Sequence, residues 1–388
     1  MKKRVIIFLA ISLLGQNLSS GQSVLKSIFR PLKNHRAIDI FKASPNLYFI
    51  RSVEQKYPSS NETTLSAWDS NGEFLWSRDF NLQTNVVSNK DGTFTGFSNV
   101  KTKNYRCGNM GFIHLTDLKM IIFDSIGTVK FDTIYQTSCY QPPNKILKIE
   151  SGIIIPLGRN MSTYRVIGPR QTASQHSIWK INFNHKVDWK QNIHFKHSFY
   201  SPNVFLKNAH SIVSIPHYNS TQIGFEFNSI NHAGMINKNV FCEIKGFPLL
   251  RIETVIPENN QNWIVIGYEY LGVWKSNVVI LNLQGEKVVW HKRFKGYPVK
   301  ALITKNGETV ILYSNNRSET MKSYATVLKI DKKGNIVQKY ILKKNGIDIF
   351  PRSIIEDGEN QFIIVGSKIE QNNLLEVKSI FFERIFLE

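Results

Sequence analysis

A short phrase that begins with Asp or Asn and carries Gly three positions later recurs about every 50 residues along this 388-residue chain. Sharp copies begin at Asp69, Asp124, Asn231, Asn282 and Asp331. A degenerate copy, Asn182-Phe-Asn-His185, stands between the second and third of these, so that successive copies are 49 to 58 residues apart. A period near 50 built from short β-rich units is typical of propellers and related repeat arrays. The chain is therefore predicted to be an array of small β-sheets.

Each copy of the phrase is expected to close a β-hairpin. Asp or Asn opens a turn by accepting a hydrogen bond from the backbone that follows, and Gly supplies the positive φ that ends it. An apolar segment such as 276–281 precedes the turn, and an alternating segment such as 286–290 follows it. One Asp-x-x-Gly alone indicates only a turn, whereas the recurrence in register indicates repeated pairs of antiparallel strands.

A second turn phrase alternates with the first and is followed by a hydrophobic segment. Its copies are Asp91-Gly92, Ser151-Gly152, Asn208-Ala209, Asn259-Asn260, Asn306-Gly307 and Asp357-Gly358, with Ser44-Pro45 as a weaker seventh. Two turns per period give four strands per repeat, which is the composition of a propeller blade. We predict an all-β, seven-bladed β-propeller of four-stranded antiparallel blades. An open or eight-bladed ring is the alternative.

The two ends of the chain suggest how the ring closes. The last repeat has strand-like segments near 351–355, 361–367 and 376–387, and no fourth segment follows them. Residues Val24–Phe29 have strand character and no partner within the first repeat. Because an open sheet edge invites unwanted pairing, we expect this N-terminal strand to complete the last blade.

Residues 1–21 resemble a signal peptide, and 22–388 are predicted to form a single propeller domain. Lys2, Lys3 and Arg4 precede the apolar stretch Val5–Leu14, which is short for a membrane span, and Gly21 suits cleavage. The alternative is a retained N-terminal anchor. The protein is expected to be exported, to the periplasm or the cell exterior, without a transmembrane segment in the mature chain.

The three cysteines are interpreted in that setting. Cys107 and Cys139 fall in predicted loops of one blade, so a disulfide between them is plausible in an oxidising compartment. Cys242 closes a predicted strand and is expected to be a buried apolar residue.

Positive charge is concentrated in one part of the chain. The formal net charge is +20, and between Ser151 and Phe225 the only carboxylate is Asp188. A basic field of this kind attracts polyanions and anionic surfaces. General solubility of a basic exported protein is the alternative explanation.

Long loops coincide with this charge in the second and third blades. Inserts at Asn99–Asp117 and Gly158–Gln175 are expected on the face where second strands meet third strands, together with the exit loop that follows the third blade. Basic and aromatic residues alternate there and suit phosphate or carboxylate groups beside sugar rings. The predicted binding residues are Lys101, Lys103, Tyr105, Arg106, Arg159, Tyr164, Arg165, Arg170, His194 and His197. Lineage-specific decoration without a ligand is the alternative.

The tryptophans and histidines divide into packing and surface roles. Trp76, Trp189 and Trp290 follow the hairpin turn at nearly matching positions and are expected to pack between blades. Trp274 falls in a loop beside Tyr270 and is a candidate stacking platform on the binding face. His194-x-x-His197 permits a metal interpretation, but zinc needs three or four convergent ligands. We therefore predict no metal site.

The segments Thr64–Trp76 and Val278–Trp290 resemble the repeat of quinoprotein-like (PQQ-repeat-like) β-propellers, and the chain is similar to repeat proteins of this type exported by Bacteroidota. In that repeat a strand ends in Asp or Asn, a Gly turn follows, and Trp comes soon after. The resemblance implies a propeller fold and, for non-enzymatic relatives, a scaffold for protein contacts. The quinone-dependent relatives hold their cofactor with adjacent cysteines, which this chain lacks, so no cofactor is expected.

These observations favour an exported binding or scaffold module that contacts an anionic glycan or an envelope protein through the basic loops of blades two and three. The alternative is a carbohydrate-active enzyme, a hydrolase or lyase, acting on an anionic polymer. A structural envelope protein without a discrete ligand is the third reading. No catalytic residue is assigned, because most carboxylates stand in turns. Nucleic acid is not an expected partner of an exported protein, and the sequence does not determine the oligomeric state.

Overall fold

The computed structural model describes the chain in fifteen segments, and within them every regular element is a β-strand. The described residues are 35–54, 63–106, 112–137, 140–141, 145–159, 174–195, 203–208, 211–215, 223–231, 233–258, 262–271, 275–316, 322–343, 347–370 and 379–387. Nothing in these segments forms a helix with the length and apolar character of a membrane span. The predicted leader, 1–21, and the predicted closing strand, Val24–Phe29, lie outside the described residues.

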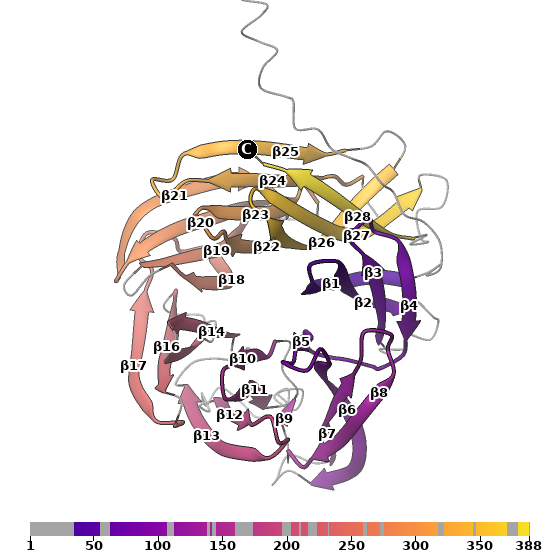
Figure 1. Ribbon diagram of the computed structural model, residues 1–388. Coiled ribbons are helices and arrows are strands. Elements are labelled where there is room, and N and C mark those ends of the chain that lie inside the picture. Colours follow the sequence, from indigo (N-terminus) through magenta and orange to yellow (C-terminus); the bar gives the residue numbers. More distant parts are fainter. Residues whose placement is uncertain are drawn as a thin grey trace, which may run out of the picture.

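Seven antiparallel sheets follow one another around a common axis, as the sequence predicts (Figure 1). Blade 1 consists of β1 (His35–Ser44), β2 (Leu47–Glu54), β3 (Thr63–Asp69) and β4 (Phe74–Arg78). Blade 2 consists of β5 (Val87–Ser88), β6 (Phe94–Arg106), β7 (Phe112–Phe123) and β8 (Val129–Tyr135). Blade 3 consists of β10 (Leu147–Ile149), β11 (Gly152–Arg159), β12 (Ser174–Ile181) and β13 (Val187–Phe195), with β9 (Tyr140–Gln141) paired to β11.

The remaining four blades repeat this order. Blade 4 is β14 (Asn203–Asn208), β15 (Ser211–Ile215), β16 (Gly224–Asn231) and β17 (Ile236–Glu243). Blade 5 is β18 (Leu250–Pro257), β19 (Asn262–Tyr270), β20 (Ser276–Gln284) and β21 (Lys287–Lys295). Blade 6 is β22 (Tyr297–Ile303), β23 (Thr309–Ser314), β24 (Ala325–Ile330) and β25 (Ile336–Leu342). Blade 7 has three described strands, β26 (Ile347–Gly358), β27 (Gln361–Glu370) and β28 (Ser379–Phe386).

Burial follows the position of a strand within its blade. The first strand of each complete blade lies nearest the axis and the fourth lies outermost (Figure 1). The middle strands β23 and β24 are buried at every residue, whereas the outer strand β21 alternates between exposed and half-buried residues. Neighbouring blades share their cores: Ile311 and Leu328 of blade 6 pack in one cluster with Ile264 and Ile280 of blade 5. Burial of both faces of the middle strands explains why they are continuous apolar runs in the sequence.

The predicted hairpin turn joins the third and fourth strands of a blade. In blade 1 the Gly72 N–H donates to the Asp69 carbonyl at 3.0 Å, and the Asp69 carboxylate accepts from the N–H groups of Asn71 and Glu73. The same set of hydrogen bonds recurs in the turns that begin at Asp124, Asn182, Asn231 and Asp331. The degenerate copy in blade 3 therefore forms the same turn, with His185 at a φ of 63° in place of glycine.

The copy in blade 5 is different from the expected one. Register pairs Gln284 with Lys287, so the hairpin turns around Gly285 and Glu286 rather than around Asn282. The bulge before the turn, here between Asn282 and Leu283, recurs in the other described blades with a fourth strand, so only the turn itself is different. The Asn282 amide donates instead to Glu258 at 3.0 Å, which ties the third strand to the turn between the first two strands of the same blade.

The conserved spacing of turn and tryptophan has a direct packing consequence. The ring of Trp290 in blade 5 lies against Gly334 in the turn of blade 6, and its indole N–H donates to the Lys332 carbonyl at 3.2 Å. Trp76 and Trp189 contact Gly127 and Gly234 of their following blades in the same way. The prediction that these three tryptophans pack between blades is confirmed. Trp179 and Trp263 are buried within their strands.

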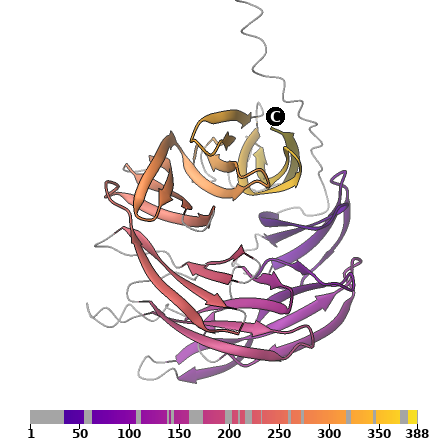
Figure 2. The ribbon, with the colours of Figure 1, turned by 60° about the vertical axis from the view of Figure 1, so that its left-hand side comes forward.

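The first and last blades meet directly, and both views show them side by side (Figures 1 and 2). Tyr48 and Trp68 of blade 1 share a core cluster with Ile363 and Phe382 of blade 7. A polar group reinforces this contact at Asp357, whose carboxylate lies 2.7 Å from the Lys42 ammonium and accepts a hydrogen bond from the Tyr48 hydroxyl. The sequence assigned Asp357 to a hairpin turn alone, whereas the structure shows it joining the ends of the ring.

The structure corrects the prediction for one loop. The insert Asn99–Asp117 is expected as an irregular loop, but β6 and β7 remain paired from Val100–Asp117 out to Arg106–Phe112. A bulge between Lys101 and Lys103 interrupts the ladder only once. The described parts of this segment, 99–106 and 112–117, are therefore paired strands and not an irregular loop.

Candidate functional site

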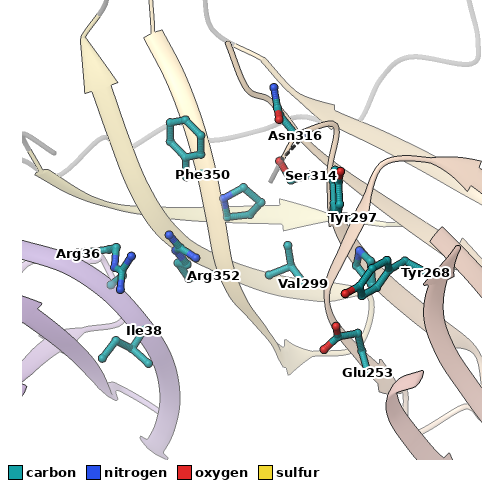
Figure 3. Close-up of a pocket in the computed structure, with 13 residues that line it drawn as sticks. Arg36, Ile38, Glu253, Tyr268, Tyr297, Val299, Ser314, Asn316, Phe350 and Arg352 are labelled. Atoms are coloured by element: carbon teal, nitrogen blue, oxygen red, sulfur yellow. Dashed lines mark hydrogen bonds between the residues drawn. The ribbon is translucent and has the colours of Figure 1, made fainter. Parts of the chain in front are cut away.

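A cavity of about 360 Å³ opens where blades 1, 5, 6 and 7 meet around the axis (Figure 3). We call it the mouth pocket. The side chains used below are Arg36, Arg352, Glu253, Tyr268, Tyr297 and Asn316. Four inner strands, β1, β18, β22 and β26, contribute to its wall, so the pocket exists only because the ring is closed.

Chain direction determines which residues reach this pocket. Inner strands start on the face where second strands end, because the chain enters each blade there and reverses on the opposite face. Arg36 stands near the start of β1 and Tyr297 begins β22, while Tyr268 stands near the end of β19. The second strands of blades 2 and 3, β6 and β11, end on the same face at Arg106 and Arg159, and the predicted basic loops beyond them lie outside the described residues.

Two arginines form one side of the mouth pocket. Figure 3 shows Arg36 from β1 and Arg352 from β26 pointing into the same region, although the two are far apart in sequence. Burial and the neighbouring Arg36 lower the pKa of Arg352 to about 10. Arg352 therefore remains cationic at neutral pH, and two guanidinium groups on one side of the pocket favour an anionic ligand.

The opposite side is aromatic and carries a carboxylate. Tyr268 and Tyr297 are both buried, with their ring centroids 6.1 Å apart. Glu253 of β18 lies beside Tyr268 and across the pocket from the arginines (Figure 3). Among the described residues that line the pocket, Glu253 is the only carboxylate. The arrangement suits a ring with an acidic substituent: cations on one side, and aromatic edges and hydroxyls on the other.

A second cavity of about 550 Å³ continues along the inner strands. It shares Glu253, Pro298 and Val299 with the mouth pocket, so the two cavities are consecutive parts of one passage. We call it the inner cavity. Its wall is largely aliphatic, from residues such as Ile256, Ala301 and Ile354, with Lys145, Lys300 and Glu356 as its other charged groups.

A polar network joins three inner strands beside the inner cavity. The Lys300 ammonium of β22 donates to the Asp39 carboxylate of β1 at 2.8 Å and to the Ser353 hydroxyl of β26 at 2.7 Å. Ser353 also donates to Asp39. Burial raises the pKa of Asp39, but Lys300, Ser353 and the more distant Arg51 outweigh it and hold the pKa below its usual value.

Lys145 contributes another cation to this wall. Burial, and then repulsion from Lys300, lower the pKa of Lys145 to about 8, while attraction to Asp39 acts in the opposite direction. Its ammonium is therefore largely protonated at neutral pH and titrates just above it. Together with Arg36 and Arg352, it gives the passage cationic groups in both the mouth pocket and the inner cavity.

Most of the predicted binding residues lie beyond what the structure describes. The backbones of Lys101, Lys103, Tyr105 and Arg106 belong to β6, that of Arg159 ends β11, and that of His194 belongs to β13, but their side chains lie outside the description. Tyr164, Arg165, Arg170, His197 and Trp274 lie wholly outside the described residues. The loop site therefore stays a prediction.

The cysteine predictions have different outcomes. Cys107 and Cys139 lie outside the described residues, so their disulfide stays a prediction. Cys242 is buried, as expected, and its sulfur lies 3.1 Å from the Gly285 carbonyl oxygen of blade 5. Burial raises the pKa of this thiol to about 12. Within the segments that the structure describes, no three His, Cys, Asp or Glu side chains gather in a way that could hold a metal ion.

Sequence reasoning missed the residues of the mouth pocket. Loop length and local charge directed attention to blades 2 and 3, whereas Arg36, Arg352 and Tyr297 stand in ordinary strand segments. Their common signal is position on an inner strand: Arg36 and Tyr297 stand at the starts of β1 and β22, and Arg352 is the sixth residue of β26. A rule that the starts of inner strands face the axis of a closed propeller would have identified Arg36 and Tyr297.

Comparison with known proteins supports the fold alone. No protein-family model and no curated protein matches the chain. A neuraminidase-like protein from A/bat/Guatemala/164/2009 aligns over 95% of this chain and 94% of its own, at 10% identity and a TM-score of 0.50. The hemagglutinin-neuraminidase of parainfluenza virus 5 with ligand DANA aligns over 96% of both chains, also at 10% identity and a TM-score of 0.50. The chain shares the β-propeller architecture of these proteins.

Proposed function

We propose that this protein is a binding module that recognises a carboxylate-bearing glycan at the mouth pocket. The observation that carries the proposal is the meeting of Arg36 and Arg352 opposite Tyr268 and Tyr297. Paired guanidinium groups are the side chains best suited to hold a carboxylate, because each offers several donors in a fixed plane. The net charge of +20 would draw anionic ligands toward the protein.

Two further observations support this class of ligand. The parainfluenza virus protein of similar architecture was solved with the ligand DANA, so a propeller of this general form can hold a small ligand. β6 and β11 end on the same face at Arg106 and Arg159, so basic loops that continue from them, as predicted for blades 2 and 3, would extend the positive surface. The resemblance of the repeat to non-enzymatic quinoprotein-like propellers fits a binding role, and the leader-like residues 1–21 fit an exported protein that meets glycans outside the cytoplasm.

The test is a titration of the purified protein with acidic and neutral sugars by calorimetry at low and high salt. Glucuronate, galacturonate and N-acetylneuraminate are the acidic probes, and glucose is the neutral one. We expect at least one acidic sugar to bind with an affinity that falls as salt increases. Arg36→Gln and Arg352→Gln should each weaken that binding by about tenfold or more, since a hydrogen bond to a charged group contributes roughly 1.5–3 kcal/mol.

Lys287→Gln is the matched control, because it removes one positive charge from an exposed position at the start of the outer strand β21, at the end away from Tyr297. Its affinity should stay within about twofold of the wild type, since surface charges far from a site act only through the screened general field. Equal affinity in all variants, or no acidic sugar bound by the wild type, would overturn the proposal. Co-purification of an envelope protein in that case would favour the scaffold role instead.

An enzyme acting on the same ligands is the second candidate, because Glu253 shares the pocket with Tyr268 and Tyr297. Most glycosidases require two carboxylates that flank the bond to be broken, and the described lining of the mouth pocket supplies one. Release of 4-methylumbelliferone from glucuronide and N-acetylneuraminide substrates, abolished by Glu253→Gln, would establish the enzyme. Absence of turnover with retained binding would establish the module.

A further inference from the structure

An exposed aromatic residue extends the mouth-pocket face over blade 5. Tyr270 ends β19, two residues after Tyr268 of the pocket, and its side chain is 44% exposed. The flanking residues Leu249 and Leu271 are also exposed, at 58% and 52%. Large apolar side chains grouped beside a polar pocket are a common mark of a binding surface.

Strand register shows that these residues form one surface. Arg251 pairs with Tyr268 and Leu250 with Glu269, and Leu249 directly precedes β18 beside the end of β19, where Tyr270 stands. The Arg251 guanidinium lies 6.0 Å from the centroid of the Tyr270 ring, at the outer limit of a cation–π contact. A short ladder therefore leads from Tyr297 through Tyr268 inside the pocket to Tyr270 and Arg251 outside it.

We call the exposed group of Leu249, Tyr270 and Leu271 the rim. Its chemistry differs from that of the mouth pocket. The mouth pocket presents two cations on one side, whereas the rim presents an accessible aromatic ring with apolar neighbours. Aromatic faces stack against flat, weakly polar surfaces such as the C–H faces of sugar rings and do not require a charge on the ligand. The position of the rim suits the ring that follows an acidic sugar already seated at the arginines.

We propose that Tyr270, supported by Arg251 and Leu249, is a second subsite that stacks the neighbouring sugar ring of an acidic oligosaccharide. This inference rests on the proposed function, because the acidic terminal sugar is taken to occupy the mouth pocket. It adds that the protein distinguishes an oligosaccharide from its isolated acidic sugar. In this arrangement the rim strengthens the binding of longer oligosaccharides, and the two arginines strengthen the binding of acidic ones.

The test compares two probes with the same charge but different length. N-acetylneuraminate and 3′-sialyllactose each carry one carboxylate, and glucuronate with cellobiouronate, in which a neutral glucose follows the glucuronate, gives a second pair of equal charge. We expect the wild type to bind the longer probe of at least one pair about threefold to tenfold more tightly. Tyr270→Leu should remove that gain and leave the affinity for the monosaccharide unchanged. Tyr270→Phe keeps the aromatic ring and should keep the gain.

Arg352→Gln separates this inference from the proposed function, because it should weaken both members of a pair equally. If Arg352→Gln weakens binding and Tyr270→Leu leaves the ratio of affinities at its wild-type value, the rim subsite is wrong and the proposed function stands. If Tyr270→Leu weakens both probes equally, Tyr270 has no selective role and the inference also fails. Absence of binding by the wild type to all four probes overturns both.

Discussion

At the residue scale, the glycine of the hairpin turn has two roles: it adopts the positive φ of the turn, and it leaves room for a tryptophan of the preceding blade. The sequence alone indicates only the first. Gly334 has a φ of 84°, which few other residues adopt without strain. A Cβ at this position would also lie 2.8 Å from the Trp290 ring of the preceding blade. The spacing between turn and tryptophan is therefore a packing constraint between blades as well as a turn signal.

The degenerate copy in blade 3 meets the same constraint differently. His185 keeps the positive φ of the glycine it replaces, and the Phe131 ring of blade 2 stacks on it with centroids 4.6 Å apart. Phe131 occupies the place that Trp76 and Trp189 hold in their blades. A cavity of about 370 Å³ remains beside this pair. Phe131 is smaller than tryptophan and His185 is larger than glycine, but together they do not fill the space between blades 2 and 3.

We expect restoration of the repeat at this site to stabilise the protein. His185→Gly relieves about 1 kcal/mol of backbone strain but loses a ring stack worth about 0.5–1.5 kcal/mol, so alone it should be nearly neutral. Phe131→Trp alone should change the free energy of unfolding by less than about 0.5 kcal/mol, because Phe131 is 39% exposed and the cavity beside it leaves room for a larger ring. The double variant should be about 1–2 kcal/mol more stable than the wild type, since the indole gains the space that the imidazole leaves.

Denaturant unfolding of the four proteins measures this coupling. The sum of the two single effects is the control, because independent sites would give additive changes in the free energy of unfolding. Additive behaviour would show that the contact between Phe131 and His185 does not determine packing between blades 2 and 3.

At the element scale, the inner strands bring together charges that no local pattern connects. Asp39 contacts Lys300 across 261 residues of sequence and Ser353 across 314. Strand identity was predictable from apolar runs and turns. The network was not, because it depends on which inner strands face one another and on a bulge that shifts β1 between Ala37 and Asp39.

Lys145 gives this network a measurable pH dependence. Because its pKa is lowered to about 8 from 10.5, the unfolded chain binds more protons than the native protein between these values. Native stability therefore rises with pH across that window, and the penalty of the ammonium that lines the inner cavity is fully present below pH 8. Lys145→Met should raise the Tm by roughly 1–3 °C at pH 7, and the gain should shrink toward pH 10.

Thermal unfolding of wild type and variant at both pH values measures the effect. The exposed Lys305 in the turn after β22 is the control, since Lys305→Met should change the Tm equally at pH 7 and pH 10. A gain for Lys145→Met that is the same at both pH values would contradict a titration of Lys145 in the inner cavity.

At the scale of the whole molecule, the sequence identified the ring but not the mouth pocket. Repeat spacing and turn chemistry are local, so they predicted seven blades and the tryptophan contacts between them. The mouth pocket is a property of closure, because Arg36 and Arg352 become neighbours only when blade 7 meets blade 1. The sequence instead pointed to the long loops of blades 2 and 3 as the binding site. The ligand role of these loops, and that of Trp274 in blade 5, stays a prediction.

The contact between the first and last blades also includes a carboxylate that the sequence assigned to a turn. Asp357 of blade 7 forms ion pairs with Lys42 of blade 1 at 2.7 Å and with Arg384 of β28 at 2.9 Å. It also accepts a hydrogen bond from Tyr48 of blade 1. Burial opposes ionisation, but the hydrogen bonds from Lys42 and Tyr48 and the charges of Lys42 and Arg384 hold the pKa of Asp357 below its usual value.

We therefore expect Asp357→Asn to weaken the ring where its ends meet. The variant leaves Arg384 without its counter-charge and should lower the free energy of unfolding by about 2–3 kcal/mol at pH 7. Because the folded pKa of Asp357 is lowered, its stabilisation is present above pH ~4 and is lost as the pH falls below that value. The difference between wild type and Asp357→Asn should accordingly shrink in acid, where both carry a neutral side chain.

Urea unfolding at pH 7 and at pH 3 measures both parts of this expectation. Glu359→Gln removes a carboxylate from an exposed position in the same turn and should change stability by less than about 0.5 kcal/mol. Tyr48→Phe removes only the hydroxyl contact and should cost about 1 kcal/mol. If Asp357→Asn proves no more destabilising than Glu359→Gln, the contact between blades 1 and 7 depends on the shared apolar cluster of Tyr48, Trp68, Ile363 and Phe382 rather than on charge.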